Sequence, residues 1–416
     1  MPQSPTNQDP DIIRKQNFRY VLIDAVGVSI SNVAAPFLPV FLTRFGASNF
    51  QVGLLSSLPG ITGLLLALVV GRFLHGRKNI IPWYSASRFL VISSFALTGI
   101  ITFLFPSKYI ILLTLTIMAL TSIPQIALSI AFSVVMNEVA GPSGRYELLS
   151  KRWAMFGFTT VVFTFFITRI IDLMPFPTNY GLMFLGLSSG GILSYIYSNK
   201  IVIPDQEAPA HEDKISISQR IKEIVDKLRE SPAFLSFSSK RFVYLSAIYM
   251  SAPILPLYFV NVVKAADSEI GTINMVMTFM MLIGYFLWPR ISAIKGGRFV
   301  LLITTLGMIS YPLLTAFQTQ VQWIYVFAAI AGLFQSGMDL VFFDELMKTV
   351  PLRYSAIFVS AAQLMEYLTT TLSPIVGTFI ADKYSLTTAL LVTAAIRLLG
   401  FLLFLLPEKF TLKQTT

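Results

Sequence analysis

The chain has 416 residues, of which 55% are hydrophobic and only 12% are charged, and its formal net charge is +10. Soluble domains contain about 25% charged residues, so this composition excludes a cytosolic enzyme, a secreted disulfide scaffold and a disordered chain. Cysteine is absent and only two histidines occur, which excludes cysteine-ligated and histidine-rich metal sites. We expect no cofactor.

Twelve apolar runs follow one another along the chain. Each is long enough to cross the hydrocarbon core of a membrane, which takes about 20 residues of helix. Lipid admits only helices or closed barrels, and these runs do not alternate in polarity, so they predict helices. The runs are Phe18–Leu42, Phe50–Leu74, Ile80–Phe105, Tyr109–Val139, Trp153–Ile171, Tyr180–Tyr197, Phe242–Val263, Ile270–Trp288, Phe299–Phe317, Trp323–Val350, Tyr354–Phe379 and Leu386–Leu406.

One connection, Ser198–Arg241, is much longer than the others and rich in charge and proline. Its centre, Ser216–Glu230, has apolar residues at helical spacing, which predicts an amphipathic helix resting on the membrane surface, with a partner-binding role as the alternative. The connection predicts three parts: an N-terminal six-helix bundle (1–197), a cytoplasmic linker (198–241) and a C-terminal six-helix bundle (242–416).

Basic residues predict the orientation. With the N-terminus inside, 24 of the 31 Lys and Arg residues lie on the cytoplasmic side, as the positive-inside rule requires. We therefore expect both termini in the cytoplasm, a plasma-membrane location and no cleaved signal peptide. Topology accounts for the positive charge, so no nucleic-acid partner is expected.

The two halves of the chain repeat each other. Ala35–Pro39 reads Ala-Pro-Phe-Leu-Pro and Ala252–Pro256 reads Ala-Pro-Ile-Leu-Pro, at an offset of 217 residues. Asn137–Val139 and Asp344–Leu346 match at an offset of 207. Several matches in one order indicate duplication, and six helices per half give two parallel pseudosymmetric bundles of the kind that rock against each other.

With twelve helices in two halves, a long central loop and internal termini, the chain resembles the major facilitator superfamily. The family's loop after the second helix ends in Gly-Arg-Arg/Lys, which Gly76–Lys78 matches, although the family's aspartate is missing from Gly71–Lys78. The resemblance implies a transporter fold whose helices 1, 4, 7 and 10 line a central cavity. The sugar-porter motif after helix 6 and the drug-antiporter motif in helix 5 are absent.

Ionisable and amide side chains within the runs are the candidate substrate or proton-coupling residues, because a charge in lipid costs about 2.5–3.5 kcal/mol on insertion scales. For each, a structural role in an ion pair, in helix packing or in snorkelling is the alternative. The candidates are Asp24, Arg88, Gln125, Gln335, Asp339, Gln363 and Glu366.

Charged residues at the predicted cytoplasmic ends of helices are the candidate gate, since salt bridges there would close one side of the protein. Acids end helices 4 and 10, and arginines follow in the next turns or occupy the loop after helix 2. These residues are Glu138, Asp344, Glu345, Arg72, Arg77, Arg145, Arg152 and Arg353.

Together these features predict a secondary active transporter of a small organic solute, coupled to protons, with export as the first hypothesis for direction. An uncoupled facilitator of the same fold and a transport-inactive sensor stay open as alternatives. An enzyme is not expected, because the runs contain no cysteine or histidine. The expected partners are the solute, protons and the lipid bilayer, and the expected state is a monomer.

Overall fold

In the computed structural model every regular element is a helix. The structure describes residues 10–204, 229, 231–350 and 355–406. Ten helical stretches in these ranges are long and apolar enough to cross a membrane. The helices α6 and α13, with 21 and 29 residues, also reach the length of a span. These twelve stretches coincide with the twelve predicted runs, which confirms an all-α polytopic membrane protein.

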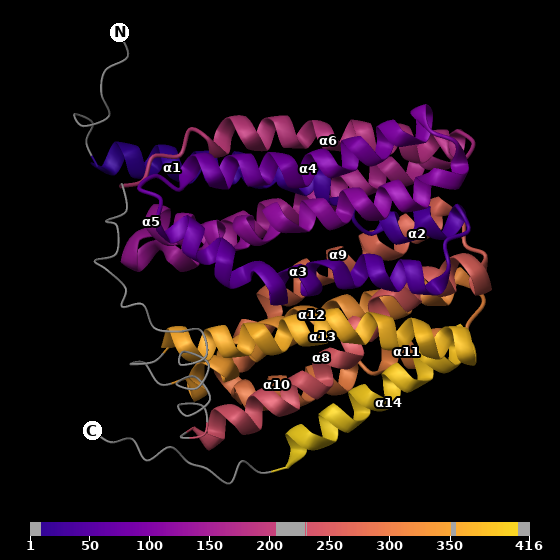
Figure 1. Cartoon of the computed structure of the whole chain (residues 1–416). Helices are drawn as coiled ribbons and strands as arrows, with labels where there is room; N and C mark the ends of the chain where they lie inside the picture. Colours follow the sequence, from indigo (N-terminus) through magenta and orange to yellow (C-terminus); the bar gives the residue numbers. More distant parts are fainter. Residues whose placement is uncertain (1–9, 205–228, 230, 351–354, 407–416) are drawn as a thin grey trace. The chain divides into compact units, whose positions relative to one another are not determined.

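The chain divides into two compact units. Unit 1 consists of residues up to Leu38 and of Leu65–Ala210. Within it α4 packs closely on α6 and α5, and α1 packs on α6 and α5 (Figure 1). Its helices are α1 (Pro10–Asn32), the second half of α3 (Asn49–His75), α4 (Ile81–Leu104), α5 (Ser107–Ile170), the short 3-10 helix η2 (Ile171–Leu173) and α6 (Thr178–Ser198).

Unit 2 consists of Pro39–Leu64 and of the chain from His211 onward. Its most extensive helix pairs are α9 with α12, α8 with α14 and α8 with α13. Its helices are α2 (Phe37–Arg44), the first half of α3, α8 (Pro232–Tyr258), the π-helix η3 (Phe259–Val263), α9 (Asp267–Lys295), α10 (Gly297–Gly307), α11 (Ser310–Thr315), α12 (Val321–Thr349), α13 (Ser355–Lys383) and α14 (Leu386–Leu405).

Each unit has its own buried core. In unit 1 the fully buried Tyr84 packs among aliphatic side chains that include Val21, Val135 and Leu148. In unit 2 the rings of Phe237, Tyr244, Phe342 and Phe404 lie 5.7–6.4 Å apart between α8, α12 and α14. Such edge and tilted ring pairs stabilise a core beyond the area that they bury.

The repeated prolines have different effects in the two halves. In the first half, helix 1 breaks into α1 and α2 over residues 33–36, directly before Phe37. In the second half, α8 stays helical through Pro253 and Pro256 and then widens into η3. A proline removes one backbone hydrogen bond and crowds the preceding turn, and the two halves relieve this crowding differently.

The fourth and fifth predicted spans run together as α5. Gly141, with φ of 66°, is its non-helical residue and divides it into two stretches. A positive φ is readily adopted only by glycine among the ordinary residues, which is why the change of direction occurs there. The predicted amphipathic helix Ser216–Glu230 lies outside the described residues, apart from Arg229.

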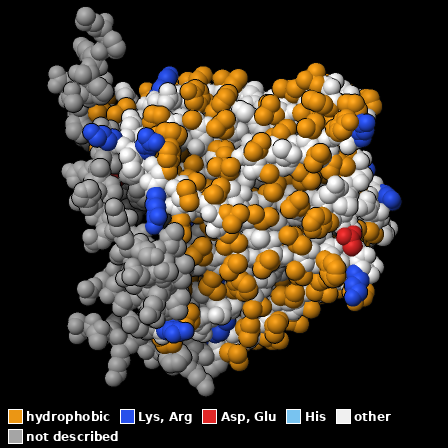
Figure 2. All heavy atoms as spheres, in the orientation of Figure 1, with side chains coloured by type: hydrophobic (Ala, Val, Ile, Leu, Met, Phe, Trp, Pro, Cys, Tyr) orange, Lys and Arg blue, Asp and Glu red, His pale blue; other side chains and the backbone are white. Residues whose placement is uncertain are grey.

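Hydrophobic side chains face outward over much of the protein. On the face shown in Figure 2 they cover the broad middle, and the few charged side chains lie near its two edges. Large apolar residues such as Leu65, Leu104 and Phe286 are more than 60% exposed. A soluble protein does not expose apolar surface on this scale, so this is the lipid-facing surface of an integral membrane protein.

Candidate functional site

The strongest buried polar cluster of unit 1 is centred on Asp24. Its carboxylate is fully buried and accepts hydrogen bonds from Ser194 Oγ at 2.5 Å and Tyr84 Oη at 3.3 Å. Arg88 Nε lies 3.3 Å from Asp24 Oδ1, and Arg88 Nη2 donates to Tyr84 Oη. The cluster joins α1, α4 and α6. These partners in the interior of the bundle hydrogen-bond and neutralise the carboxylate, which fits a structural role for Asp24 and Arg88, the alternative to substrate binding or proton coupling.

Arg152 lies beside this cluster on α5. Its side chain is buried, 4% exposed, and its guanidinium stacks on the rings of Phe132 and Trp153, with Cζ 4.6 and 5.5 Å from the ring centres. It interacts electrostatically with Asp24, Tyr84 and Arg88. Arg152 makes no ion pair with any residue that the structure describes. Among the candidate gate acids, Glu138 is exposed and makes no salt bridge with Arg152.

In unit 2 a second carboxylate cluster joins α8 and α13. Arg241 Nη2 donates to Glu366 Oε2 at 2.8 Å, and Tyr249 Oη donates to Glu366 Oε1 at 2.8 Å. The Glu366 side chain keeps 28% of its surface exposed. Glu366 is thus neutralised by an arginine and yet accessible, which allows the ion pair to open and close.

The third carboxylate, Asp339 on α12, has no cationic partner within the described part of the chain. Gln335 Nε2 donates to Asp339 Oδ1 at 2.7 Å, and Tyr285 Oη on α9 donates to Oδ2 at 3.2 Å. Its side chain is exposed. Tyr249 interacts electrostatically with both Glu366 and Asp339, so the two carboxylates of unit 2 belong to one polar region.

The remaining polar candidates are accessible. Gln125 on α5 and Gln363 on α13 are both exposed. The serines that accompany Gln125 donate to carbonyls of their own helix, as Ser129 Oγ does to Ile126 at 2.8 Å. Such bonds satisfy the hydroxyl locally. The presence of these serines on α5 therefore needs no ligand to explain it.

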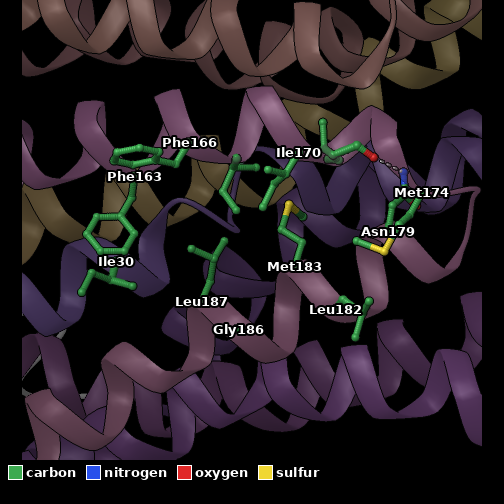
Figure 3. Close-up of a pocket in the computed structure, with 12 residues that line it drawn as sticks. Ile30, Phe163, Phe166, Ile170, Met174, Asn179, Leu182, Met183, Gly186 and Leu187 are labelled. Carbon is green, nitrogen blue, oxygen red and sulfur yellow. Dashed lines mark hydrogen bonds between the residues drawn. The ribbon is translucent and has the colours of Figure 1, made fainter.

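The clearest pocket of unit 1 is apolar. It has a volume of about 340 Å³ between α1, α5 and α6, and Figure 3 shows Ile30, Phe163, Phe166 and Leu187 among the residues that line it. Its polar member, Asn179, uses Nδ2 to donate to the carbonyl of Ile171 at 3.1 Å. None of the predicted site residues lines this pocket. In the described ranges no group of three or more His, Asp or Glu residues comes together as a metal site.

Comparisons with known proteins agree with this architecture. A family model described as Major Facilitator Superfamily matches residues 241–416. A mutant of the nucleoside transporter NupG is similar over 94% of this chain and 99% of that chain, with a TM-score of 0.74 and 9% identity. A bacterial homologue of the human lysosomal transporter Spinster is similar over 96% of this chain and 97% of that chain, with a TM-score of 0.66 and 14% identity.

The unmutated NupG structure gives a TM-score of 0.67 at 11% identity, over 96% of this chain and all of that chain. No curated protein matches the sequence. The sequence likeness to the major facilitator superfamily therefore lies in the second half of the chain. The fold likeness to the two solved transporters covers both halves.

The predicted gate residues that the structure describes lie mostly at the surface. Asp344 and Glu345 both pair with Lys348 on their own helix, at 2.7 and 2.8 Å. Arg72 is exposed, and Arg77 is exposed and lies over the rings of Phe73 and Trp83. Arg353 and the side chain of Arg145 are outside the described residues.

The structure also has polar contacts between distant parts of the chain within unit 2. Within unit 2, Arg44 Nη2 lies 3.1 Å from Asp267 Oδ1 and donates to the carbonyl of Ala265 at 2.6 Å. Asn49 Nδ2 donates to Asp382 Oδ1 at 2.7 Å. These bonds attach Pro39–Leu64 to α9 and α13. The sequence analysis assigned no role to these residues, because their separation along the chain gives no signal of pairing.

Glycines bring the first half of α3 against α13. A Cβ built at Gly60 would lie 2.7 Å from the backbone nitrogen of Thr371, and one at Gly53 would lie 2.5 Å from Thr378 Oγ1. Such distances are too short for any side chain. Small residues at helix contacts let backbones approach in membranes, and this approach holds Pro39–Leu64 in unit 2.

Sequence reasoning also missed Arg241. It was counted among the residues of the cytoplasmic linker, but α8 begins at Pro232 and includes it. Arg397, an arginine within the last predicted span, is 2% exposed and donates to the carbonyl of Met308 at 2.6 Å and to Ser251 Oγ at 2.8 Å. That geometry favours a structural role for Arg397.

Proposed function

We propose that this protein is a proton-coupled secondary active transporter that moves a small organic solute across the plasma membrane by alternating access. The observation on which this rests is Asp339, an accessible carboxylate within a membrane-spanning helix whose described partners, Gln335 and Tyr285, are both neutral. A charge in that environment is costly, and taking up a proton removes the cost. An accessible group of this kind is suited to carrying a proton.

Glu366 supplies the second element of the proposal. When its carboxylate is charged it binds Arg241 at 2.8 Å, and a proton on it would cancel the attraction. The ion pair is partly exposed, so its net stabilisation is small and its opening requires little free energy. Protonation of Glu366 would thereby be linked to the contact between α8 and α13.

The test is solute flux in proteoliposomes with an imposed pH gradient, beginning with nucleosides because the structural neighbour NupG is named as a nucleoside transporter. We expect wild-type uptake or efflux to follow the gradient. Asp339→Asn and Glu366→Gln should each lose at least tenfold of gradient-driven flux and retain exchange of solute down its own gradient. Asp344→Asn is the matched control, since Asp344 lies on the same helix but pairs with a cation, Lys348.

The outcomes separate the alternatives. Flux that ignores the pH gradient in wild type would make the protein an uncoupled facilitator. Solute binding without flux would make it a sensor. An equal loss of gradient-driven flux in Asp344→Asn and Asp339→Asn would contradict the proton-carrying role proposed for Asp339.

A further inference from the structure

The buried charges of unit 1 do not balance. Arg88 and Arg152 are 4% exposed each, and the carboxylate in their cluster is that of Asp24. Asp24 Oδ1 and Oδ2 are already occupied by Arg88, Ser194 and Tyr84. Two buried cations therefore face one buried anion, and Arg152 is the cation without an ion pair among the described residues.

No neighbouring acid on α5 supplies the missing charge. Glu147, one helical turn before Arg152, is exposed and pairs with Lys151 at 2.7 Å. Glu138 is exposed on the other side of the break at Gly141. The rings of Phe132 and Trp153 offset part of the cost by cation–π contact, but a ring does not neutralise a charge. A buried charge without a counter-ion is strongly unfavourable.

The guanidinium of Arg152 is fully enclosed at Nε but not at its two Nη nitrogens. Nε is fully enclosed and has no hydrogen-bond partner, whereas its two Nη nitrogens are not among the enclosed, unpartnered atoms. Since those nitrogens have no described hydrogen-bond partner either, they retain accessible surface. Arg152 thus presents its paired Nη–H donors, the planar fork that binds carboxylate and phosphate with two parallel hydrogen bonds.

We propose that Arg152 is an oxyanion-binding residue, which binds the carboxylate or phosphate group of a ligand beside the Asp24–Arg88 pair. The ligand chemistry is a small oxyanion flanked by apolar or aromatic matter, because the guanidinium lies between two aromatic rings. The same chemistry occurs in an anionic solute and in the phosphodiester of an anionic lipid. This site is separate from the carboxylates proposed to carry protons and does not depend on them.

The test is thermal unfolding of the purified full-length chain, with no gradient and no flux. The probes are sodium phosphate and sodium benzoate in neutral detergent, compared with sodium chloride at equal ionic strength, and nanodiscs of phosphatidylglycerol compared with phosphatidylcholine. We expect at least one oxyanion probe to raise the unfolding midpoint of wild type by a few degrees. A rise with phosphate or benzoate identifies a free solute as the source, and a rise with phosphatidylglycerol alone identifies a lipid.

Variants connect the effect to the residue. Arg152→Gln should abolish the rise, Arg152→Lys should retain a smaller one, and Arg169→Gln should leave it unchanged, since Arg169 is an exposed arginine on the same helix. In chloride alone, Arg152→Gln should unfold at or above the wild-type temperature, because the substitution removes an uncompensated charge. The proposal is overturned if no oxyanion probe stabilises wild type, or if Arg152→Gln responds as wild type does. The comparison of the unfolding temperatures of Arg152→Gln and wild type in chloride tests the uncompensated charge without any ligand.

Discussion

The ion pair between Asp24 and Arg88 should be among the most strongly coupled pairs in unit 1. At the observed 3.3 Å, two unit charges in an effective dielectric of about 20 attract each other by about 5 kcal/mol. Desolvation offsets much of this attraction, but removal of one partner leaves the other buried and uncompensated, which costs about 3–5 kcal/mol. Asp24→Asn and Arg88→Met should each destabilise the protein by an amount in that range.

The double variant should be far less harmful than the sum of the two single variants, since it leaves neither member of the Asp24–Arg88 pair without its partner. We expect a coupling free energy of about 2–3 kcal/mol from the double-mutant cycle. The assay is denaturant unfolding of the purified chain in detergent, followed by the fluorescence of its four tryptophans. The exposed pair Glu147–Lys151, joined at 2.7 Å, is the matched control and should show no measurable coupling. Additive effects at Asp24 and Arg88, or coupling equal to that of the control pair, would refute the reasoning.

Three further predictions concern packing and the contacts of Pro39–Leu64. Gly60→Ala should destabilise the protein by about 1–3 kcal/mol in the same unfolding assay, because the added methyl group overpacks the contact with α13. At Gly186 a Cβ would meet nothing within 4 Å, so Gly186→Ala should be neutral or should stabilise the protein by up to about 1 kcal/mol. Arg44→Gln should lower stability only slightly and less at high salt, because the pair with Asp267 is partly exposed; a large, salt-independent loss would contradict this. The chain has no native cysteine, so Arg44→Cys and Asp267→Cys can be cross-linked to each other with a cleavable bifunctional maleimide. We expect the cross-link to block solute flux and its cleavage to restore it. Undiminished flux in the cross-linked protein would exclude a moving gate at this contact.

The spans were predictable because each rests on one local property, a run of apolar residues as long as the membrane is thick. All twelve runs coincide with helices, and only the junctions differ, as at Gly141 and at the start of α8. Junctions depend on single backbone angles and on packing. Hydropathy does not report either of these.

Individual candidates were predictable, but their partners were not. An ionisable residue stands out in an apolar run, so Asp24, Asp339 and Glu366 were identified from the sequence alone. Their partners lie far away along the chain: Arg241 is 125 residues from Glu366, and Ser194 is 170 residues from Asp24. No local pattern encodes such a pairing, and this is why Arg152 was expected in a gate although the structure places it in the interior of unit 1.

The early position of Pro39–Leu64 in the chain has a consequence for how the protein is made. Asn49 and its partner Asp382 are 333 residues apart, so this stretch leaves the ribosome long before α13 exists. Its glycine-lined surface therefore lacks its packing partner, in the bilayer or bound to the insertion machinery, until α13 has been synthesised and inserted. Closure of so distant a contact is slow, and biogenesis of this protein should therefore be most vulnerable in the interval between the second helix and the eleventh.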